Sequence, residues 1–456
     1  MMPSLHMGAI AARLGLPWSG AAQSVAGLCI DSRQLRPGEL FVALPGARVD
    51  GHDFVAAAAA AGAVAALVQR PVTAALPCLQ VPDTLAAMSD IAAANRDAYA
   101  GEVVAITGSC GKTSVKQLCK AILGACAPTV ATAGNFNNEI GVPLTLGRLG
   151  ADTRFAVIEM GARGRGQVAQ LCRLARPRVG TVLNAMEAHL EGFGSLDDVA
   201  DIKAEIFDGL GSAGVGVVNA DQRWSPGWRR RVAATGAQLL TWSLDGAGDV
   251  TAADIEERGL AGSRFRLCHG GASVAVELAL PGRHNVANAL AAAALALACG
   301  LELPRIADGL AAARGEPGRS RAETLGDGTL LVDDSYNANP GSVRAAIALL
   351  AASAGHRALL LGEMLELGAA SEALHREMGE RARRAGIDAF WGVGAALAPA
   401  VAAFGSGGRL FPDRAAAAAA CAELPGQCDV ILVKGSRGAA METLAQALRV
   451  ATGGSD

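Results

Sequence analysis

The sequence predicts an α/β protein of three domains. These are a small α/β N-terminal domain, a central P-loop-type domain with a mostly parallel sheet, and a C-terminal doubly wound, Rossmann-like domain. A chain of 456 residues is longer than one hydrophobic core normally supports. Apolar runs alternate with amphipathic helix patterns through its middle, which is typical of a parallel sheet covered by helices. Strand–helix units then repeat four times in the last ~140 residues, which favours a second sheet of this kind.

Residues 1–82 predict the small N-terminal domain. Short strands are expected at 28–30 and 40–43, followed by a helix at 54–62 that leads into a strand at 63–68. The segment 77–83 contains two prolines and is the expected domain boundary.

Residues 83–316 predict the central domain. Its apolar runs at 103–107, 155–159, 179–184 and 215–219 are the expected parallel strands. The segments 263–267 and 273–280 alternate apolar and polar residues, which predicts a β-rich insert.

Residues 317–456 predict the C-terminal domain. Strands are expected at 330–333, 358–361, 389–393 and 430–433, and each of the four is followed by a helix pattern. The segment 314–319, with two glycines and a proline, is the expected hinge.

The composition indicates a globular enzyme or binding protein. Hydrophobic residues make up 51% of the chain, charged residues 18%, and the net charge is -3. Nothing here calls for nucleic acid or an anionic membrane, and the alanine-rich stretches fall short of the ~20 apolar residues that span a bilayer. Ten cysteines without a Cys-x-x-Cys pair, and no secretory signal pattern, favour a cytoplasmic protein with reduced thiols.

The strongest local motif is TGSCGKTS at 107–114, between a predicted strand and a predicted helix. Its glycines let the backbone approach a polyphosphate, and the helix N-terminus offers N–H donors. Lys112 could reach the β- and γ-phosphate oxygens, and the Thr113 hydroxyl could bind Mg²⁺. Gly108 and Gly111 enclose two residues where the usual loop has four, which indicates a variant family. The alternative is a glycine-rich turn with an incidental Gly-Lys-Thr.

Two further residues follow predicted strand ends. Glu159 ends the strand at 155–159, and His189 lies in the turn after the strand at 179–184. Because the carboxyl ends of parallel strands form the ligand crevice, both side chains are candidate metal ligands. A helix cap or ion pair is the alternative for Glu159, and a structural or solvated imidazole is the alternative for His189.

Lys203 has an unusual place in its predicted helix. It falls on the apolar face, among Leu196, Val199, Ile206 and Phe207. Burial favours a neutral amine. Such an amine could react with CO₂ to form a metal-binding carbamate, whereas the alternative is a lysine that extends its ammonium to water.

Two more sites carry polar side chains at element ends. Asn285 starts a predicted alanine- and leucine-rich helix, where capping alone would account for it. Asp334 and Asn337 follow the first strand of the C-terminal domain and face its expected crevice.

Together these segments resemble the Mur ligase family along essentially the whole chain. The matching motifs, in order, are TGSCGKTS (107–114), GNFNNEIGVP (134–143), VIEMGA (157–162), AHLEGFGS (188–195), IKAEIF (202–207), PGRHNVAN (281–288), DDSYNANP (333–340) and VKGSR (433–437). Within the family, DSR-x5-GELFVALPG (31–46), DGHDF (50–54), YNA (336–338) and GEMLELG (362–368) are most similar to members that add D-alanyl-D-alanine.

The resemblance implies an ATP- and Mg²⁺-dependent ligase of peptidoglycan precursor synthesis. Its substrates would be UDP-N-acetylmuramoyl-tripeptide and D-alanyl-D-alanine, joined through an acyl phosphate. The chain would bind no nucleic acid, insert in no membrane, and act as a cytoplasmic monomer.

The resemblance also implies a role for each matching residue. ATP would contact Gly108, Ser109, Cys110, Gly111, Lys112, Thr113 and Ser114 at its phosphates, Asn285 at adenine, Arg319 at the γ-phosphate and Asp334 at the ribose. Thr113, Glu159, His189 and a carbamylated Lys203 would bind Mg²⁺, and Lys112, Glu159, His189, Lys203 and Arg319 would be catalytic. Ser32, Arg33, Asn138 and Asn337 would contact the other substrates. Arg163, Gln167 and Ile30 depart from the family pattern, outside the phosphate chemistry.

Other functions remain open on the sequence. A family member that adds diaminopimelate or lysine, or a folylpolyglutamate synthase, would share the nucleotide motifs. A non-catalytic nucleotide-dependent regulator would not need to keep Lys112, Thr113, Glu159, His189 and Lys203 together. The sequence does not distinguish diaminopimelate from lysine as the third peptide residue.

Overall fold

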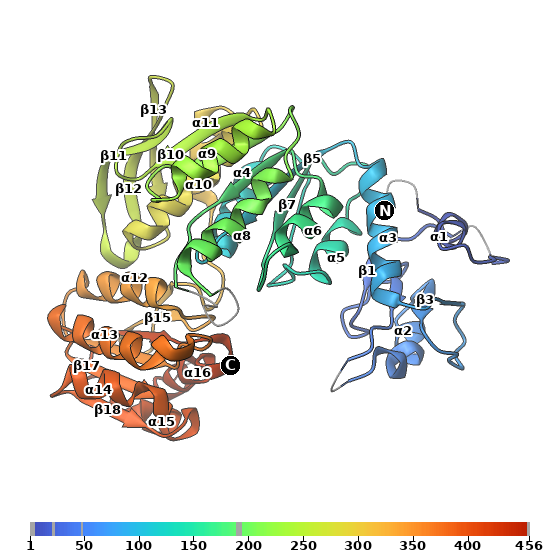
Figure 1. Cartoon of the computed structure of the whole chain (residues 1–456). Coiled ribbons are helices and arrows are strands. Elements are labelled where there is room, and N and C mark those ends of the chain that lie inside the picture. Colours follow the sequence, from blue (N-terminus) through green and yellow to red (C-terminus); the bar gives the residue numbers. More distant parts are fainter. Residues whose placement is uncertain (1–4, 21–22, 47–48, 188–193, 454–456) are drawn as a thin grey trace.

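Three sheets, each formed by a separate segment of the chain, organise the computed structural model (Figure 1). The structure describes residues 5–20, 23–46, 49–187 and 194–453. This arrangement confirms the predicted fold class. None of the helices within these ranges is both long enough and apolar enough to cross a bilayer.

The first sheet has four parallel strands in the order β1-β2-β3-β4. The elements of this segment are α1 (Met7–Arg13), β1 (Leu28–Cys29), β2 (Leu40–Val42), α2 (Val55–Ala60), β3 (Ala65–Val68) and β4 (Cys78–Gln80). Strand β4 lies inside the proline-containing segment for which only a boundary was expected.

The central sheet has nine strands in the order β13-β12-β11-β10-β9-β8-β5-β7-β6. The strands are β5 (Glu102–Thr107), β6 (Thr129–Ala131), β7 (Phe155–Glu159), β8 (Val179–Val182), β9 (Val215–Asn219), β10 (Gln238–Ser243), β11 (Val250–Glu257), β12 (Ser263–His269) and β13 (Ala272–Leu278). Only the pairs β11–β12 and β12–β13 are antiparallel among these strands. Strands β12 and β13 match the predicted β-rich insert, whereas β11 was not predicted. The parallel strands therefore bring the carboxyl ends of β5, β7, β8 and β9 to one edge.

Helices cover both faces of the central sheet. They are α3 (Thr84–Ala98), α4 (Lys112–Gly124), α5 (Gly141–Leu146), α6 (Gln167–Ala175), α8 (Leu196–Asp208), α9 (Ser225–Ala234), α10 (Arg283–Ala298) and α11 (Leu303–Ala312). Successive residues of β5 point to opposite faces of the sheet. Val103 and Ala105 belong to the buried cluster that includes α3, α5, α6, α8 and α9. Val104 and Ile106 belong to the cluster that includes α4, α10 and α11.

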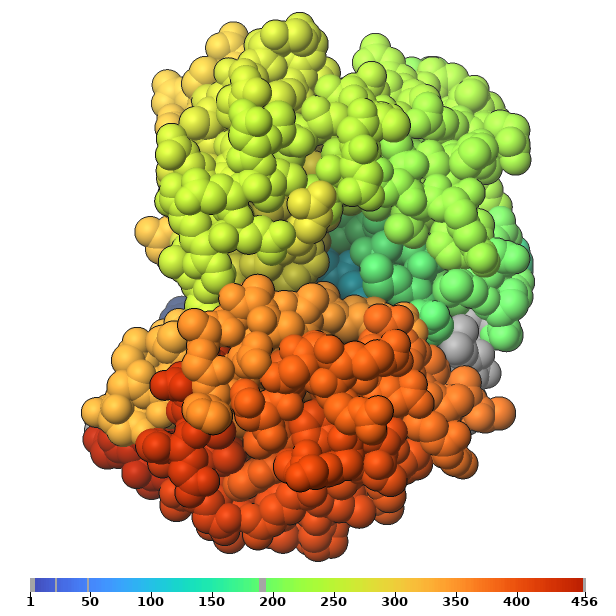
Figure 2. Space-filling model, turned by 90° about the vertical axis from the view of Figure 1, so that its left-hand side faces the viewer, coloured from blue at the N-terminus to red at the C-terminus, as the bar shows by residue number. Residues whose placement is uncertain are grey.

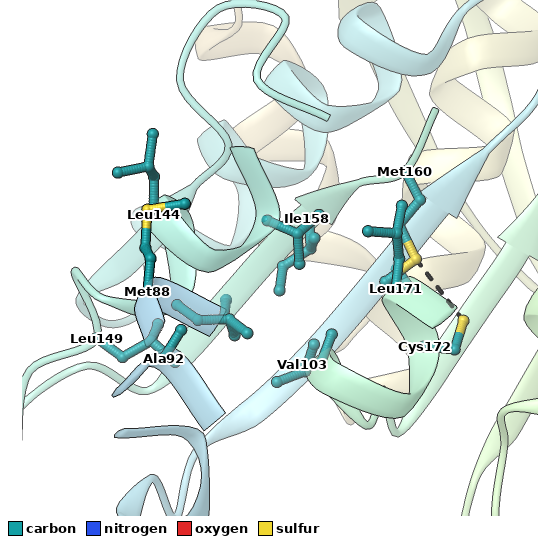
Figure 3. Close-up of a cluster of buried hydrophobic side chains, with 14 of the residues drawn as sticks. Met88, Ala92, Val103, Leu144, Leu149, Ile158, Met160, Leu171 and Cys172 are labelled. Carbon is teal, nitrogen blue, oxygen red and sulfur yellow. Dashed lines mark hydrogen bonds between the residues drawn. The ribbon is translucent and has the colours of Figure 1, made fainter. Parts of the chain in front are cut away.

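Helix α3 is fixed to the central sheet by one of these cores (Figure 3). Met88 and Ala92 of α3 belong to the same buried cluster as Val103 of β5 and Ile158 of β7. The edge of the cluster contains a sulfur contact of 3.7 Å between Cys172 Sγ and Met160 Sδ. Glu159 lies between Ile158 and Met160, so this packing fixes the strand end that presents it.

The C-terminal sheet has six strands in the order β14-β15-β19-β16-β17-β18, all parallel except β14. Its elements are β14 (Arg321–Thr324), β15 (Leu330–Asp334), α12 (Pro340–Ala351), β16 (Arg357–Gly362), α13 (Ser371–Arg384), β17 (Ala389–Val393), α14 (Ala398–Phe404), β18 (Gly408–Phe411), α15 (Arg414–Ala420), β19 (Val430–Lys434) and α16 (Glu442–Ala451). Helices α12, α13 and α14 cover one face, and α15 and α16 cover the other. The predicted doubly wound arrangement is confirmed.

Candidate functional site

The turn between β5 and α4 has the geometry of a phosphate-binding loop. Gly111 precedes the helix with a φ of 81°, which favours glycine. A Cβ at this position would also lie 2.5 Å from Asn288 Oδ1 of α10. The helix N-terminus that follows leaves its first N–H groups without intrahelical acceptors, as anion binding requires.

The segment after β8 holds this loop in place. Asn184 Oδ1 accepts a hydrogen bond of 2.9 Å from the Cys110 backbone N–H, and Asn184 Nδ2 donates to the Cys110 carbonyl at 3.2 Å. The Ser109 hydroxyl donates to the Met186 carbonyl at 3.2 Å and accepts from the Met186 N–H at 3.0 Å. The loop conformation therefore depends on the neighbouring strand end as well as on its own glycines.

Lys112 lies at the first position of α4 and folds back over the loop. Its ammonium donates to the carbonyls of Gly108, at 2.7 Å, and Ser109, at 3.4 Å. Burial lowers the pKa of Lys112, whereas Glu159 acts in the opposite direction. A phosphate in the loop would offer this ammonium a charged acceptor in place of two neutral carbonyls.

Glu159 is a buried carboxylate with a partner on each oxygen. Its side chain lies at the end of β7 and is 2% exposed. The Thr113 hydroxyl donates to Oε2 at 2.9 Å, and Asn137 Nδ2 donates to Oε1 at 2.7 Å. Lys116 Nζ lies 3.8 Å from Oε2 and donates to the Gly134 carbonyl at 3.0 Å. The hydroxyl and carboxylate predicted as metal ligands are therefore adjacent.

Lys203 is buried in α8 as the sequence predicted, with 3% exposure. Burial and the nearby charge of Lys112 lower its pKa to about 7, with a smaller opposing effect of Cys110. The amine is therefore substantially neutral near neutral pH. Its carbamylation stays a prediction.

The C-terminal sheet contributes a second group of polar side chains. The Arg319 guanidinium lies 4.1 Å from the centre of the Tyr336 ring. Asp334 Oδ1 accepts from the Ser320 N–H at 3.0 Å, while Oδ2 pairs with Lys434 of β19. Lys434 also donates to the Asn337 carbonyl at 3.0 Å. The end of β15 is thus tied to β19 and to Ser320, which directly follows the predicted hinge at 314–319.

The two groups meet in one cavity of about 1050 Å³. Figure 2 shows the surface hollowed between the central and C-terminal segments. The predicted site residues that line the cavity are Gly108, Ser109, Cys110, Gly111, Lys112, Thr113, Ser114, Asn138, Glu159, Lys203, Asn285, Arg319, Asp334 and Asn337. Cys110 Sγ lies 3.0 Å from Asn339 Nδ2 at the start of α12, so the phosphate loop contacts the C-terminal segment directly.

Other predicted residues lie elsewhere or have other partners. Arg33 is ion-paired with Asp31 at 2.7 Å, and neither Ser32 nor Arg33 is among the described residues that line the cavity, although Ile30 is. Asn138 Oδ1 accepts from the N–H groups of residues 140 and 141 at the start of α5. His189 lies outside the described residues.

Asn285 of α10 and Gln167 of α6 also make hydrogen bonds within the protein. Asn285 Nδ2 donates to the Pro281 carbonyl at 2.8 Å, which fixes the start of α10. Gln167 Oε1 accepts from the Arg163 N–H at 2.8 Å, so these two departures from the family pattern contact each other at the cavity wall.

Lys116, Asn137 and Asn184, which contact Glu159 or the phosphate loop, are among the residues here for which the sequence predicted no role. Lys116 follows Thr113 by three residues, which places both side chains on one side of α4 and is a signal available in the sequence. Asn184 ends the predicted strand at 179–184, which is a weaker signal. Asn137 is one of three asparagines in its motif, and only the fold distinguishes it from Asn138.

Comparison with known proteins identifies three family models along the chain. They are described as Mur ligase family, catalytic domain (residues 24–98), Mur ligase middle domain (106–296), and Mur ligase, glutamate ligase domain (320–437). The chain is 46% identical over 433 residues to UDP-N-acetylmuramoyl-tripeptide–D-alanyl-D-alanine ligase of Escherichia coli strain K12, covering 94% of this chain and 95% of that protein.

Solved structures are similar over almost the full length. MurF from Acinetobacter baumannii superimposes with a TM-score of 0.86 at 33% identity, covering 97% of this chain and 98% of that one. MurF ligase from Thermotoga maritima in complex with ADP superimposes with a TM-score of 0.80 at 27% identity, covering 94% and 98%.

Proposed function

Because this chain belongs to the Mur ligase family, we propose that it uses ATP to join D-alanyl-D-alanine to UDP-N-acetylmuramoyl-tripeptide in peptidoglycan precursor synthesis. The observation that carries the proposal is the convergence of Lys112, Lys203 and Arg319 on one cavity beside a phosphate-binding loop. Burial is the main cause that lowers the pKa of both lysines, and the charge of Lys112 lowers that of Lys203 further, while Arg319 has a smaller effect of the same sign on Lys112. A polyphosphate would relieve this mutual repulsion.

The bound nucleotide extends from the phosphate loop to the C-terminal sheet. Its phosphates lie on the first turn of α4, with Lys112 at the β- and γ-oxygens and Arg319 at the γ-phosphate. Asn285 contacts adenine and Asp334 contacts the ribose. The ADP complex of the Thermotoga maritima ligase supports a nucleotide site in this fold.

The residues present fit a magnesium ion that binds together with phosphate. Magnesium prefers oxygen ligands and is commonly held by one or two carboxylates plus substrate phosphates. Thr113 Oγ1 and Glu159 Oε2 are adjacent oxygens at the phosphate loop. Within the described ranges no cluster of three or more His, Cys, Asp and Glu side chains could hold a metal ion. Carbamylated Lys203 and His189 complete the proposed ligand set. When bound, the ion neutralises negative charge on the phosphates.

The reaction proceeds by two displacements. The terminal carboxylate of the tripeptide attacks the γ-phosphorus of ATP, forming an acyl phosphate and releasing ADP. The amine of D-alanyl-D-alanine then attacks the acyl carbon, and phosphate leaves with one oxygen of the original carboxylate as the amine loses a proton. Lys112 and Arg319 stabilise the charge that develops on the transferred phosphoryl group.

The three parts of the chain divide this work. Residues 1–82 bind the UDP-muramoyl substrate through Ser32 and Arg33, residues 83–316 bind ATP, and residues 317–456 bring the dipeptide. Asn138 and Asn337 contact the substrates within the cavity. The enzyme acts as a monomer in the cytoplasm.

Phosphate release with different amine donors tests the proposed function. Purified enzyme with ATP, Mg²⁺ and the UDP-tripeptide should release phosphate when D-alanyl-D-alanine is added, and should respond far less to diaminopimelate, lysine or glutamate. Parallel reactions with the diaminopimelate and lysine forms of the tripeptide define the acceptor. A preference for another amine donor, or no ATP turnover with any donor, would overturn the proposal.

A further inference from the structure

Lys116 is a fully buried lysine for which the proposed reaction has no role. Its side chain is 0% exposed, although it belongs to the amphipathic helix α4. An ammonium removed from water is costly unless it is paired, and the loss of a charged partner from such a pair is more costly still. A lysine in this position therefore needs a specific partner.

Glu159 is the anionic partner of Lys116. The distance from Lys116 Nζ to Glu159 Oε2 is 3.8 Å, and the hydrogen bond to the Gly134 carbonyl holds the ammonium in place. Burial has the largest effect on Lys116 and lowers its pKa. Glu159 and Glu316 raise this pKa, whereas the charges of Arg319 and Lys120 lower it further. The pair leaves Glu159 charge-compensated.

This ammonium shares a carboxylate oxygen with the proposed metal pair. Glu159 Oε2 is the atom to which the Thr113 hydroxyl donates, and it is also the oxygen nearest to Lys116. A divalent ion held by Thr113 and Glu159 would lie close to a fixed positive charge. Repulsion inside the protein is stronger than in water, because the effective dielectric constant there is lower.

We propose that Lys116 prevents a divalent cation from binding to Thr113 and Glu159 until a nucleotide supplies phosphate oxygens. Lys116 is thus a positioning residue, which acts through Glu159 and contacts no substrate. Before a nucleotide binds, it provides the positive charge beside Glu159. The negative charge of ATP offsets the repulsion, and the ion binds with the nucleotide. This inference rests on the proposed metal pair.

Binding of Mn²⁺ alone, followed by electron paramagnetic resonance, tests the inference without turnover. Lys116→Met removes the charge and keeps most of the side-chain volume. We expect it to bind Mn²⁺ at least ~10-fold more tightly than the wild type when no nucleotide is present. Lys116→Arg keeps the charge and should bind Mn²⁺ as weakly as the wild type.

Two controls make the result specific. Lys120→Met removes an exposed lysine one turn further along α4 and should leave Mn²⁺ affinity unchanged. Adding Glu159→Gln to Lys116→Met should abolish the gain in Mn²⁺ affinity, because the Glu159 carboxylate is the proposed metal ligand. If Lys116→Met does not fold, as judged by circular dichroism, Lys116→Gln replaces it in the same titration.

The outcomes separate this inference from the function on which it rests. Equal or weaker Mn²⁺ binding by the neutral Lys116 variant, with normal ATP-dependent Mn²⁺ binding by the wild type, would overturn the role of Lys116 alone. Absence of Mn²⁺ binding by the wild type even with ATP would instead overturn the proposed metal pair.

Discussion

Lys203→Ala, read by ¹³C NMR, tests the proposed carbamate. Burial beside Lys112 lowers the pKa of Lys203 from 10.5 to about 7. At pH 8 such a pKa leaves roughly 90% of the amine neutral, against about 0.3% for an ordinary lysine. Because only the neutral amine attacks CO₂, the reactive fraction is larger by about 300-fold.

The pH dependence of the carbamate follows from the same shift. Protonation removes the nucleophile, so lowering the pH from 8 to 6 should reduce the neutral fraction from roughly 90% to roughly 10%. In ¹³C-bicarbonate, wild-type enzyme should show a carbamate carbon signal that falls accordingly. Depleting CO₂ at mildly acidic pH should reduce ligation at the same time.

The variant should lose both the signal and the activity. Lys203→Ala should reduce ligation by at least ~10²-fold while keeping the fold, because alanine favours a helix. A short carboxylic acid should partly restore its activity by supplying the missing carboxylate. Lys120→Ala, on the exposed side of α4, is the matched control and should behave as wild type. Near-normal turnover by Lys203→Ala, or active wild-type enzyme without a carbamate signal, would refute the reasoning.

Three further perturbations address the nucleotide site. Lys112→Ala should reduce kcat by at least ~10²-fold, because a cation at transferred phosphate acts mainly in the transition state; near-normal turnover would contradict the phosphate-loop assignment. Asn137→Leu removes the 2.7 Å hydrogen bond to Glu159 and should raise the Mg²⁺ concentration needed for half-maximal activity, which an unchanged Mg²⁺ dependence would disprove. Saturating ATP and UDP-tripeptide should reduce the radius of gyration in small-angle scattering by closing the hinge at 314–319. A constant radius would argue against Lys112 and Asp334 sharing one nucleotide.

The parts of the site that follow from local periodicity were predictable from the sequence. The spacing of Val199, Ile206 and Phe207 placed Lys203 on a buried helix face, and the structure confirms that burial. The apolar run ending at Glu159 predicted a strand end at the crevice, where β7 does end. Both inferences needed only the periods of helices and strands.

Contacts between distant loops were not predictable in this way. Asn137, rather than Asn138, binds Glu159 because the turn after Gly134 orients the Asn137 amide towards β7, whereas the Asn138 side chain accepts from N–H groups at the start of α5. Asn184 holds Cys110 across 74 positions of sequence. The burial of Lys116 likewise depends on the Gly134 loop folding against α4. Such contacts depend on tertiary packing, which no local pattern encodes.

Transfer of ¹⁸O from the tripeptide to phosphate is the most direct test of ligation through an acyl phosphate. The UDP-tripeptide, labelled with ¹⁸O in its terminal carboxylate, is incubated with enzyme, ATP, Mg²⁺ and D-alanyl-D-alanine, and both products are analysed by mass spectrometry. The mechanism predicts a UDP-pentapeptide and one ¹⁸O in each phosphate released. Phosphate without ¹⁸O, or no pentapeptide, would contradict it.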